Sequence, residues 1–263
     1  MSVAEISVVR PRSMRRHVDL IAHLVFRQFR LRYSRSVLGW IWSLIQPLTR
    51  LAVFTFTFKV ILNSSVKDFP EFFFSGLLTW TLFSAGLMSA TLSPIAQREL
   101  MLKPGFPRAA VPVIAVAVDL LDYVITLPIL LIFLAVKGNW PSTALLTLPL
   151  LVMLEVAFTV GVGYVLAAAN TYVRDVRLVV ELTLLLGFYI TPVFYDASSV
   201  PARYRWLVDV NPVAIMVRTQ REVFRGTLPS LGSFLTVGIL SLGSLTAGLL
   251  VFRVAGPNLG DEL

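Results

Sequence analysis

The stretch "LRYSRSVLGWIWSLIQPL" (residues 31–48) changes from basic to apolar at a single glycine. Arg32 and Arg35 stand before Gly39, and a tryptophan-rich run that contains Pro47 follows it. Basic residues beside an apolar run are typical of the cytoplasmic edge of a membrane span, where tryptophan also gathers. The stretch therefore predicts that the chain enters a bilayer here, through a helix that its proline bends.

The composition of the whole chain also favours a membrane protein. Of its 263 residues, 56% are hydrophobic and only 14% are charged, and the mean hydropathy is +0.78. Soluble domains carry roughly 25% charged residues, so most of this chain faces something other than water. The net charge of +8 would also suit a nucleic-acid-binding domain, but the cations lie between long apolar runs, and we expect no nucleic-acid partner.

Six segments are apolar over about the 20 residues that a bilayer core requires. We predict an all-α membrane protein in which residues 1–36 form a cytoplasmic N-terminal segment and residues 37–263 form one transmembrane domain. The six predicted spans cover residues 37–61, 72–95, 109–136, 143–169, 178–195 and 231–251.

The distribution of basic residues predicts the orientation of these spans. With a cytoplasmic N-terminus, fourteen Lys and Arg residues fall on the inner side and eight on the outer side. Positive charge concentrates in cytoplasmic loops, and an even number of spans returns the chain to its starting side. Both termini are therefore predicted to be cytoplasmic.

The N-terminal segment reads as an amphipathic helix. Between residues 16 and 30, polar and apolar side chains separate at helical spacing, which suits a helix lying along the inner leaflet. A simpler interpretation is a topology signal that needs no defined helix. The polar face holds Arg16, Asp19, His23, Arg27 and Arg30, and the apolar face holds Val18, Ile21, Ala22, Val25 and Phe29.

The stretch between the last two predicted spans, residues 196–229, mixes charged and apolar residues. Asn211-Pro212 divides it, and this dipeptide favours a turn. We predict two short amphipathic helices here, which either lie flat on the outer face or dip back into the protein.

Several kinds of chemistry are absent from the sequence. There is no cysteine, no Gly-x-Ser-x-Gly, and no phosphate-binding glycine motif before any lysine. His17 and His23 both precede the first span, so no histidine metal centre or proton relay is expected within the membrane. We predict no catalytic residue and no metal site, and any ATP would be hydrolysed by another chain.

Charged residues inside the apolar runs allow two interpretations. Each must face protein or water, because an unpaired charge at mid-bilayer costs at least about 2.5–3.5 kcal/mol. A proton-coupled carrier would use the carboxylates but would show two related halves, which we do not find. We favour a structural role, in which Arg50 pairs with a carboxylate, tested as Glu155, and Asp119 and Asp122 line a hydrated cleft. The remaining embedded charge is Glu181.

Six motifs in register resemble one family: the permeases of ABC transporters that export polysaccharides and polyol phosphates, including O-antigen, group 2 capsule and wall teichoic acid. The opening stretch, "RYSRSVLGWIWSLIQPL", is similar to that family's approach to its first span. The others are "FFFSGLLTWTLF", "LMLKPGFPR", "NTYVRDVRLVVE", "TPVFYD" and "NPVAIMVRTQREVFRG".

The resemblance implies a bacterial plasma (inner) membrane protein that works as a homodimer with two copies of a separate ATPase subunit. No cofactor is then expected on this chain, and ATP and Mg belong to the partner. A lipid-linked polysaccharide would be the substrate. The residues implied to couple to the ATPase are Gln97, Arg98, Glu99, Lys103, Phe106, Pro107, Arg108, Arg174 and Asp175.

The same resemblance assigns three further sets of residues. Substrate access at the N-terminal helix would involve Arg27, Arg30, Arg32, Tyr33, Arg35, Trp40 and Trp42. A channel whose aromatic rings stack on sugar faces would be lined by Phe54, Phe58, Trp80, Phe83, Phe188, Tyr189 and Tyr195, although such rings often only pack. The outer gate would include Pro192, Asn211, Pro212 and Arg221.

Two alternative functions stay open. A drug- or lipid-efflux permease of the same superfamily would share this architecture. A membrane glycosyltransferase or acyltransferase would need an acidic or histidine cluster on a water-facing loop, and the loops offer none.

Overall fold

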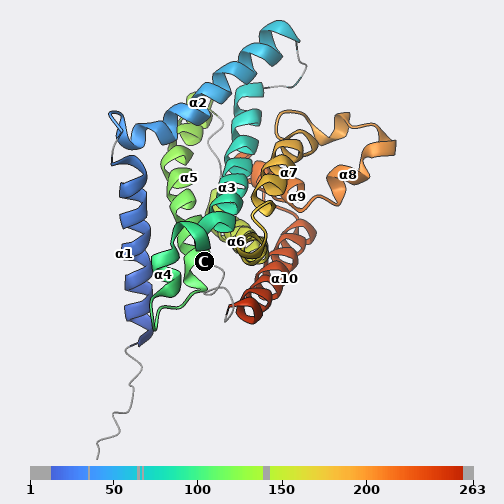
Figure 1. The fold of residues 1–263 in the computed structure, drawn as a ribbon. Helices are drawn as coiled ribbons and strands as arrows, with labels where there is room; N and C mark the ends of the chain where they lie inside the picture. The colour runs from blue at the N-terminus through green and yellow to red at the C-terminus, as the bar shows by residue number, and fades with distance from the viewer. Residues whose placement is uncertain (1–12, 35, 64–65, 67, 139–142, 257–263) are drawn as a thin grey trace, which may run out of the picture.

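The computed structural model describes residues 13–34, 36–63, 66, 68–138 and 143–256, and within these ranges the regular structure is helical. Figure 1 shows the arrangement. The α-helices are α1 (Ser13–Tyr33), α2 (Trp42–Thr55), α3 (Phe69–Ala96), α4 (Arg98–Leu102), α5 (Ala110–Val136), α6 (Leu148–Tyr172), α7 (Val176–Ile190), α8 (Trp206–Asp209), α9 (Pro212–Phe224) and α10 (Leu231–Ala255).

Five helical segments, counted within the described residues, are long and apolar enough to cross a membrane. They agree with five of the six predicted spans. The remaining predicted span, residues 178–195, overlaps α7, which begins at Val176, has 15 residues and ends in turns at the Thr-Pro-Val-Phe sequence. The five segments are Gly39–Ile61, Phe69–Ala96, Ala110–Val136, Thr143–Tyr172 and Leu231–Ala255.

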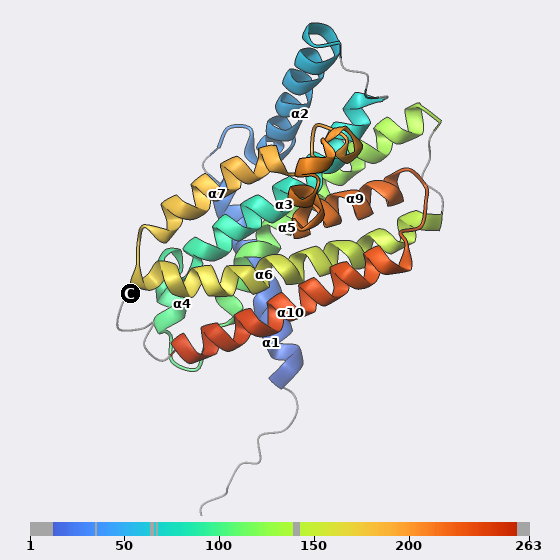
Figure 2. The same ribbon diagram turned by 90° about the vertical axis from the view of Figure 1, so that its right-hand side faces the viewer.

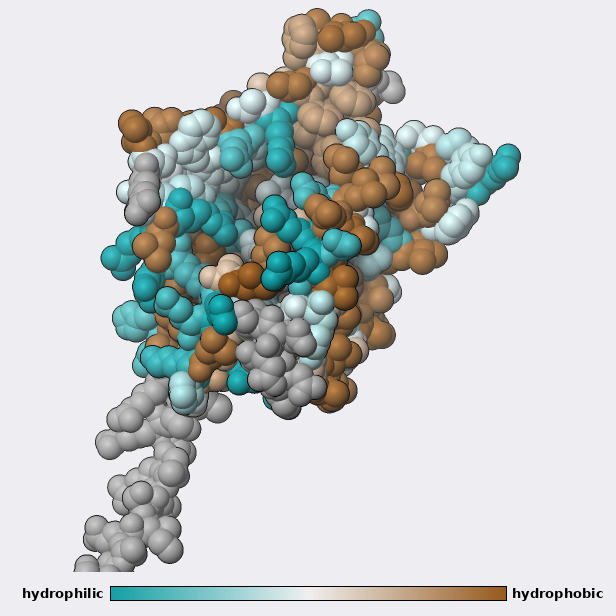
Figure 3. All heavy atoms as spheres, in the orientation of Figure 1, coloured by the Kyte–Doolittle hydropathy of each residue, from teal (hydrophilic) through white to brown (hydrophobic). Residues whose placement is uncertain are grey.

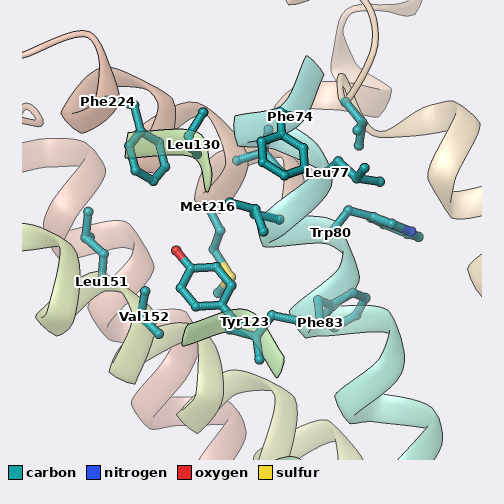
Figure 4. Close-up of a cluster of buried hydrophobic side chains, with 14 of the residues drawn as sticks. Phe74, Leu77, Trp80, Phe83, Tyr123, Leu130, Leu151, Val152, Met216 and Phe224 are labelled. Atoms are coloured by element: carbon teal, nitrogen blue, oxygen red, sulfur yellow. The ribbon is translucent and has the colours of Figure 1, made fainter. Parts of the chain in front are cut away.

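Helix α3 lies at the centre of the fold. It packs against α5 and α6 along much of its length and against α7 and α9 on another side, and Figure 2 shows α7, α3, α6 and α10 running side by side. Phenylalanine and leucine side chains fill the space between them. Figure 4 shows Phe74 and Leu77 of α3 in one cluster with Leu130 of α5, Leu151 of α6 and Met216 of α9.

Helices α6 and α10 approach each other through glycines. A Cβ atom on Gly248 would overlap the carbonyl oxygen of Gly161, and one on Gly161 would overlap the backbone between Ser244 and Leu245. Small residues at such a seam allow close backbone approach, and the van der Waals packing that results favours helix association in membranes. The two glycines therefore fix the tightest helix contact in this fold.

Helix α1 packs along α5 through most of its predicted apolar face (Figure 1), although Ala22 of that face is exposed. Val25 is buried against Ile114 and Val118, with Ile21 and Phe29 beside it. The described members of the polar face, Asp19, His23, Arg27 and Arg30, are exposed, as predicted. The side chains of Arg16 and Val18 lie outside the described residues.

The chain turns from α1 into the first span at Gly39, whose φ of +55° is in the left-handed region that favours glycine. A 3-10 turn (Gly39–Ile41) leads into α2, and a π-helical turn (Phe56–Ile61) follows it. Helix α2 belongs to the least buried of the five candidate spans, and Figure 3 shows hydrophobic side chains on the surface near the C-terminal end of that span.

The stretch after α7 contains two α-helices, α8 and α9, divided at Val210 and Asn211 as predicted, and two 3-10 turns (Ala197–Ser199 and Ala202–Tyr204) before them. The side chain of Asn211 caps α9 by accepting hydrogen bonds from the backbone N–H groups of Val213 and Ala214, at 3.0 and 3.3 Å. Helix α9 is buried against α3 and α6, whereas α8 is largely exposed. Of the two predicted placements, α9 therefore takes the one that dips back into the protein.

Candidate functional site

A cavity of about 480 Å³ lies between the end of α1 and helices α2, α3 and α5. The predicted access residues Arg32, Tyr33 and Trp42 line it, whereas Trp40, exposed two residues earlier, does not. Arg27 and Arg30 point to solvent on α1, and Arg35 lies outside the described residues. The other lining side chains are Ser43, Gln46, Pro47, Arg50, Leu78, Thr81, Leu82, Ser84, Ala85, Asp119, Asp122, Tyr123 and Thr126.

Arg32 bridges the two aspartates of α5. Its Nη1 donates to Asp119 Oδ1 and to Asp122 Oδ2, both at 2.8 Å, and the Tyr33 hydroxyl donates to Asp122 Oδ1 at 2.9 Å. The predicted cleft at Asp119 and Asp122 is therefore present, and its carboxylates hold the end of α1 against α5.

These contacts set the protonation of the two α1 side chains. Burial opposes the charge of Arg32, but the Asp119 and Asp122 carboxylates outweigh it and raise the pKa of the guanidinium. Burial, together with the hydrogen bond to Asp122, raises the pKa of Tyr33 to about 12. Arg32 stays charged and Tyr33 stays a hydrogen-bond donor at neutral pH.

The predicted pairing of Arg50 with Glu155 is wrong. Arg50 lines the cavity and makes no hydrogen bond or ion pair within the described part of the chain. Glu155 is fully buried on α6, and its Oε2 accepts a hydrogen bond of 2.6 Å from Gln220 Nε2. The Oε1 of Gln220 accepts in turn from the hydroxyl groups of Thr79, at 2.9 Å, and Tyr123, at 3.4 Å. Four helices therefore share one buried polar network, which we call the Gln220 network.

All seven aromatic residues predicted to line a channel belong to one continuous chain of ring contacts, which we call the aromatic chain. Phe188 is its hub, 5.9 Å from Phe54 and Trp80 and 5.5 Å from Phe194 between ring centroids. Phe194, which we did not predict, joins Tyr195 to the rest at 5.2 Å. The remaining contacts join Phe58 to Phe54 at 6.0 Å, Phe83 to Trp80 at 5.8 Å and Tyr189 to Phe188 at 5.6 Å.

Members of the aromatic chain differ in exposure. Trp80 and Phe83 are buried and line a second pocket of about 360 Å³ between α3, α6 and α7. Tyr189 is 58% exposed, on the same face of the fold as the leucines of α7. In a single copy these rings pack mainly on each other, so the aromatic chain forms one wall and does not enclose a passage.

The residues predicted to couple to an ATPase gather at one end of the fold. Arg98, Glu99, Lys103 and Pro107 are exposed there, as are Arg174 and Asp175 in the turn between α6 and α7. The sequence did not indicate what holds this second turn: Asn170 accepts a hydrogen bond from the backbone N–H of Arg177 and donates one to Thr91 O, at 3.2 and 3.3 Å.

The other members of the predicted coupling set stabilise the loop itself. Arg108 donates to the carbonyl oxygens of Met101 and Gly256, which joins the loop to the end of α10. Phe106 packs between two apolar clusters. Gln97 donates to Gln28 Oε1 of α1 at 3.3 Å. Only the exposed residues are therefore available to a partner.

The predicted gate residues meet at the opposite end. Arg221 is 6% exposed and donates to the carbonyl oxygens of Pro192, Val193 and Phe72 at 2.9–3.1 Å, and to the Ser75 hydroxyl at 3.4 Å. Its guanidinium also lies 3.7 Å from the centre of the Phe72 ring. Asn211 donates to Thr191 Oγ1 at 2.9 Å, and Pro212 is the first residue of α9. The turn after α7 is thus fastened to α9 and α3.

Comparison with known proteins identifies the family. The family described as ABC-2 type transporter matches residues 19–224, from α1 to the end of α9. The chain belongs to the ABC-2 type transporter family. This match covers the cavity, the coupling end and the fastened turn, so each belongs to the transporter domain.

Individual relatives are similar over most of the chain. The O-antigen export system permease protein RfbA of Klebsiella pneumoniae is 31% identical over 80% of this chain and 82% of its own length. A protein of the same name from Myxococcus xanthus is 29% identical over 96% and 98%. The polysialic acid transport protein KpsM of Escherichia coli is 23% identical over 88% and 91%.

Sequence reasoning missed several residues of these sites. Gln220 gave no signal beyond its place next to Arg221, and its partner Glu155 is 65 positions away. Gln46 could have been found, because Trp42, Gln46 and Arg50 follow each other at intervals of four residues and so share a face of α2. Arg50 itself stands out in the sequence, but as half of an ion pair rather than as a cavity residue.

Proposed function

We propose that this chain is the permease subunit of an ABC exporter that moves a lipid-linked polysaccharide, of the O-antigen, capsule or teichoic-acid type, out of the cytoplasm. The observation that carries the proposal is the 29% identity over 96% of the chain to a protein named as an O-antigen export permease. A protein named as a polysialic acid transporter matches nearly as much of the chain. The subunit is a transporter rather than an enzyme.

The aromatic chain supports a sugar polymer as the substrate. Ring faces attract the C–H faces of pyranoses without fixing them at one point, so a polymer can slide along them. The exposed apolar face of α7, which includes Leu178, Leu182 and Leu185, supports a second copy across this wall. Two aromatic chains would then face each other across a passage between the copies.

Energy for transport comes, in this proposal, from ATP and Mg bound by a separate ATPase subunit. That subunit docks at the exposed side chains of residues 98–107 and of the turn at Arg174 and Asp175. This end is the cytoplasmic end, and the fastened turn is at the outer end of a six-span protein in the bacterial inner membrane. Helix α1 lies at the inner leaflet, where Trp40 and the exposed arginines of α1 meet lipid headgroups.

Deleting the gene and assaying polymer at the cell surface tests this function. We expect lipid-linked polymer to accumulate inside the cell and to disappear from the surface. A drug-efflux permease would instead leave surface polymer unchanged and alter drug susceptibility, and that result would reject the proposal.

A charge-reversal pair tests the docking surface. Arg98→Glu combined with Lys103→Glu should reduce recovery of the ATPase with the permease by about tenfold, because charge complementarity controls such contacts. Arg203→Glu combined with Arg205→Glu, exposed at the opposite end, is the matched control. Equal recovery with both pairs would place the ATPase elsewhere.

A further inference from the structure

The cavity beside α1 contains polar groups that the protein itself does not use. Within the described residues, the Arg50 guanidinium and the Gln46 amide make no hydrogen bond. The Thr81 hydroxyl and Asp119 Oδ2 are buried without a hydrogen-bond partner, and Asp119 is only 5% exposed. Gln46 and Arg50 are exposed, so the buried unsatisfied atoms at this cavity are the Thr81 hydroxyl and Asp119 Oδ2. Buried polar groups in folded proteins are normally satisfied, so these two, facing a cavity that Gln46 and Arg50 also line, point to a ligand.

Three of the lining residues form a stripe along α2. Trp42, Gln46 and Arg50 follow each other at intervals of four residues, so they lie on one helical face, and all three line the cavity. The stripe presents an aromatic ring, then an amide, then a guanidinium. An ionisable residue within a membrane span suggests a functional site unless a partner neutralises it, and Arg50 has no such partner in the described chain.

The charges around the cavity do not favour an anion. Arg32 is already bound to Asp119 and Asp122, so its charge is not available to a phosphate group. The cavity is lined by two arginines and two aspartates, which gives a formal sum of zero. A phosphate would meet as much negative as positive charge here.

A neutral molecule rich in hydroxyl groups matches the cavity better. Gln46 and Arg50 offer several N–H donors, Asp119 Oδ2 offers an acceptor, and the Thr81 hydroxyl offers either. The flat ring of Trp42 suits the C–H face of a sugar. The volume of about 480 Å³ is within the usual range for small-ligand pockets.

We propose that this cavity binds a neutral pyranose unit of the exported molecule through Trp42, Gln46 and Arg50. The inference rests on the proposed function, since it names the part of the substrate that this permease recognises. It assigns Arg50 to hydroxyl recognition, and it assigns Arg32 to holding α1 against α5 rather than to binding the lipid phosphate.

The test measures binding to the permease–ATPase complex in lipid nanodiscs by saturation-transfer NMR. The probes are methyl α-D-mannopyranoside, methyl α-L-rhamnopyranoside and methyl β-D-galactopyranoside, with inorganic pyrophosphate as a separate arm. We expect at least one glycoside to bind and pyrophosphate not to displace it. Binding of pyrophosphate with loss of the glycoside signal would show an anion site and overturn the proposal.

Variants make the assignment specific. Trp42→Ala and Gln46→Ala should each weaken glycoside binding about fivefold, whereas Trp42→Phe, which keeps a ring face, should weaken it less. Thr49→Ala, an exposed position on α2 outside the cavity, is the matched control. Unchanged binding in Trp42→Ala and Gln46→Ala, or no glycoside binding by the wild type, would overturn the cavity assignment.

The failure of this inference is distinguishable from that of the proposed function. Wild-type complex that exports lipid-linked polymer but binds no glycoside in the cavity retains the function and loses the site. Loss of polymer export on gene deletion, measured separately, depends on none of these variants.

Discussion

Helices α2 and α3 have almost the same apolar character and opposite environments. The most apolar 18 residues of Gly39–Ile61, the segment that contains α2, have a mean hydropathy of 1.3, and those of α3 have 1.4. Yet 6% of these residues are buried in the first and 72% in the second. Helix α3 is surrounded by α5, α6, α7 and α9, whereas α2 contacts mainly α3 and α5. Hydropathy therefore identifies a span without telling whether its neighbours are protein, lipid or a second subunit.

Two arginines, one beside α3 and one on α2, show what this difference means for polar groups. Arg221, next to α3, is buried and donates to four acceptors, so its charge serves the fold. Arg50, on α2, has no partner in the described chain and faces a cavity. The guanidinium of Arg221 is used by the fold, whereas that of Arg50 is left for a ligand to contact.

The largest effect is expected for Arg221→Met. Removing the guanidinium takes a donor from the carbonyl oxygens of Pro192, Val193 and Phe72, and each buried acceptor left unsatisfied typically costs about 1–3 kcal/mol. Thermal unfolding in detergent should show a large fall in the melting temperature. The neighbouring exposed Arg225, changed to Met, is the control; equal melting of both variants would mean that the fastened turn does not depend on Arg221.

A smaller loss, about 3 kcal/mol, is expected for Gly248→Ala, because overpacking forces the backbones of α6 and α10 apart. The new methyl group would overlap the Gly161 carbonyl oxygen. Gly243→Ala, on the same helix with open space around its Cβ position, should be nearly neutral. Comparing the free energies of unfolding of the two variants tests whether the contact between α6 and α10 requires a glycine at position 248.

Breaking the Gln220 network should cause the next largest loss of stability. Gln220→Leu should destabilise the protein by about 2 kcal/mol, because it leaves the buried Glu155 carboxyl without its hydrogen bond. Adding Glu155→Leu should recover much of the loss, since replacing both partners by apolar groups removes the unsatisfied atom. If the double variant is as unstable as the sum of the single ones, the contact between Gln220 and Glu155 is not what stabilises this region.

These contacts also show how far the sequence could be read. Apolar run length located five spans, and helical periodicity located the faces of α1, because both patterns are local. Pairing of embedded charges is not local. Glu155 is on α6, which packs on α3, α9 and α10, while Arg50 is on α2, so no spacing rule could exclude the pair that we expected.

The candidate sites divide in the same way. The sequence motifs located the coupling loop and the turn at Pro192, but they could not separate residues that face a partner from those that hold the loop. Arg98 and Arg108 carry the same charge ten positions apart, and only the second is bound to Met101 and Gly256. That distinction needs the positions of the backbone carbonyl oxygens of Met101, in the same loop region, and of Gly256, at the far end of the chain.

The smallest effect is expected where α1 meets α5. In a double-mutant cycle, Arg32→Gln and Asp122→Asn should show a coupling of about 1 kcal/mol or less, because the Arg32 side chain is 36% exposed and water screens the pair. The same cycle with Arg30, which is exposed on α1, should give no coupling.

The raised pKa of Tyr33, about 12, means that its stabilising contribution is complete below pH 10, its usual pKa, and is lost between pH 10 and pH 12. Measuring the unfolding free energy of wild type and Tyr33→Phe across that interval separates the two donors: the difference should shrink as pH rises, and a constant difference would show that the Tyr33 hydroxyl does not stabilise the junction through Asp122.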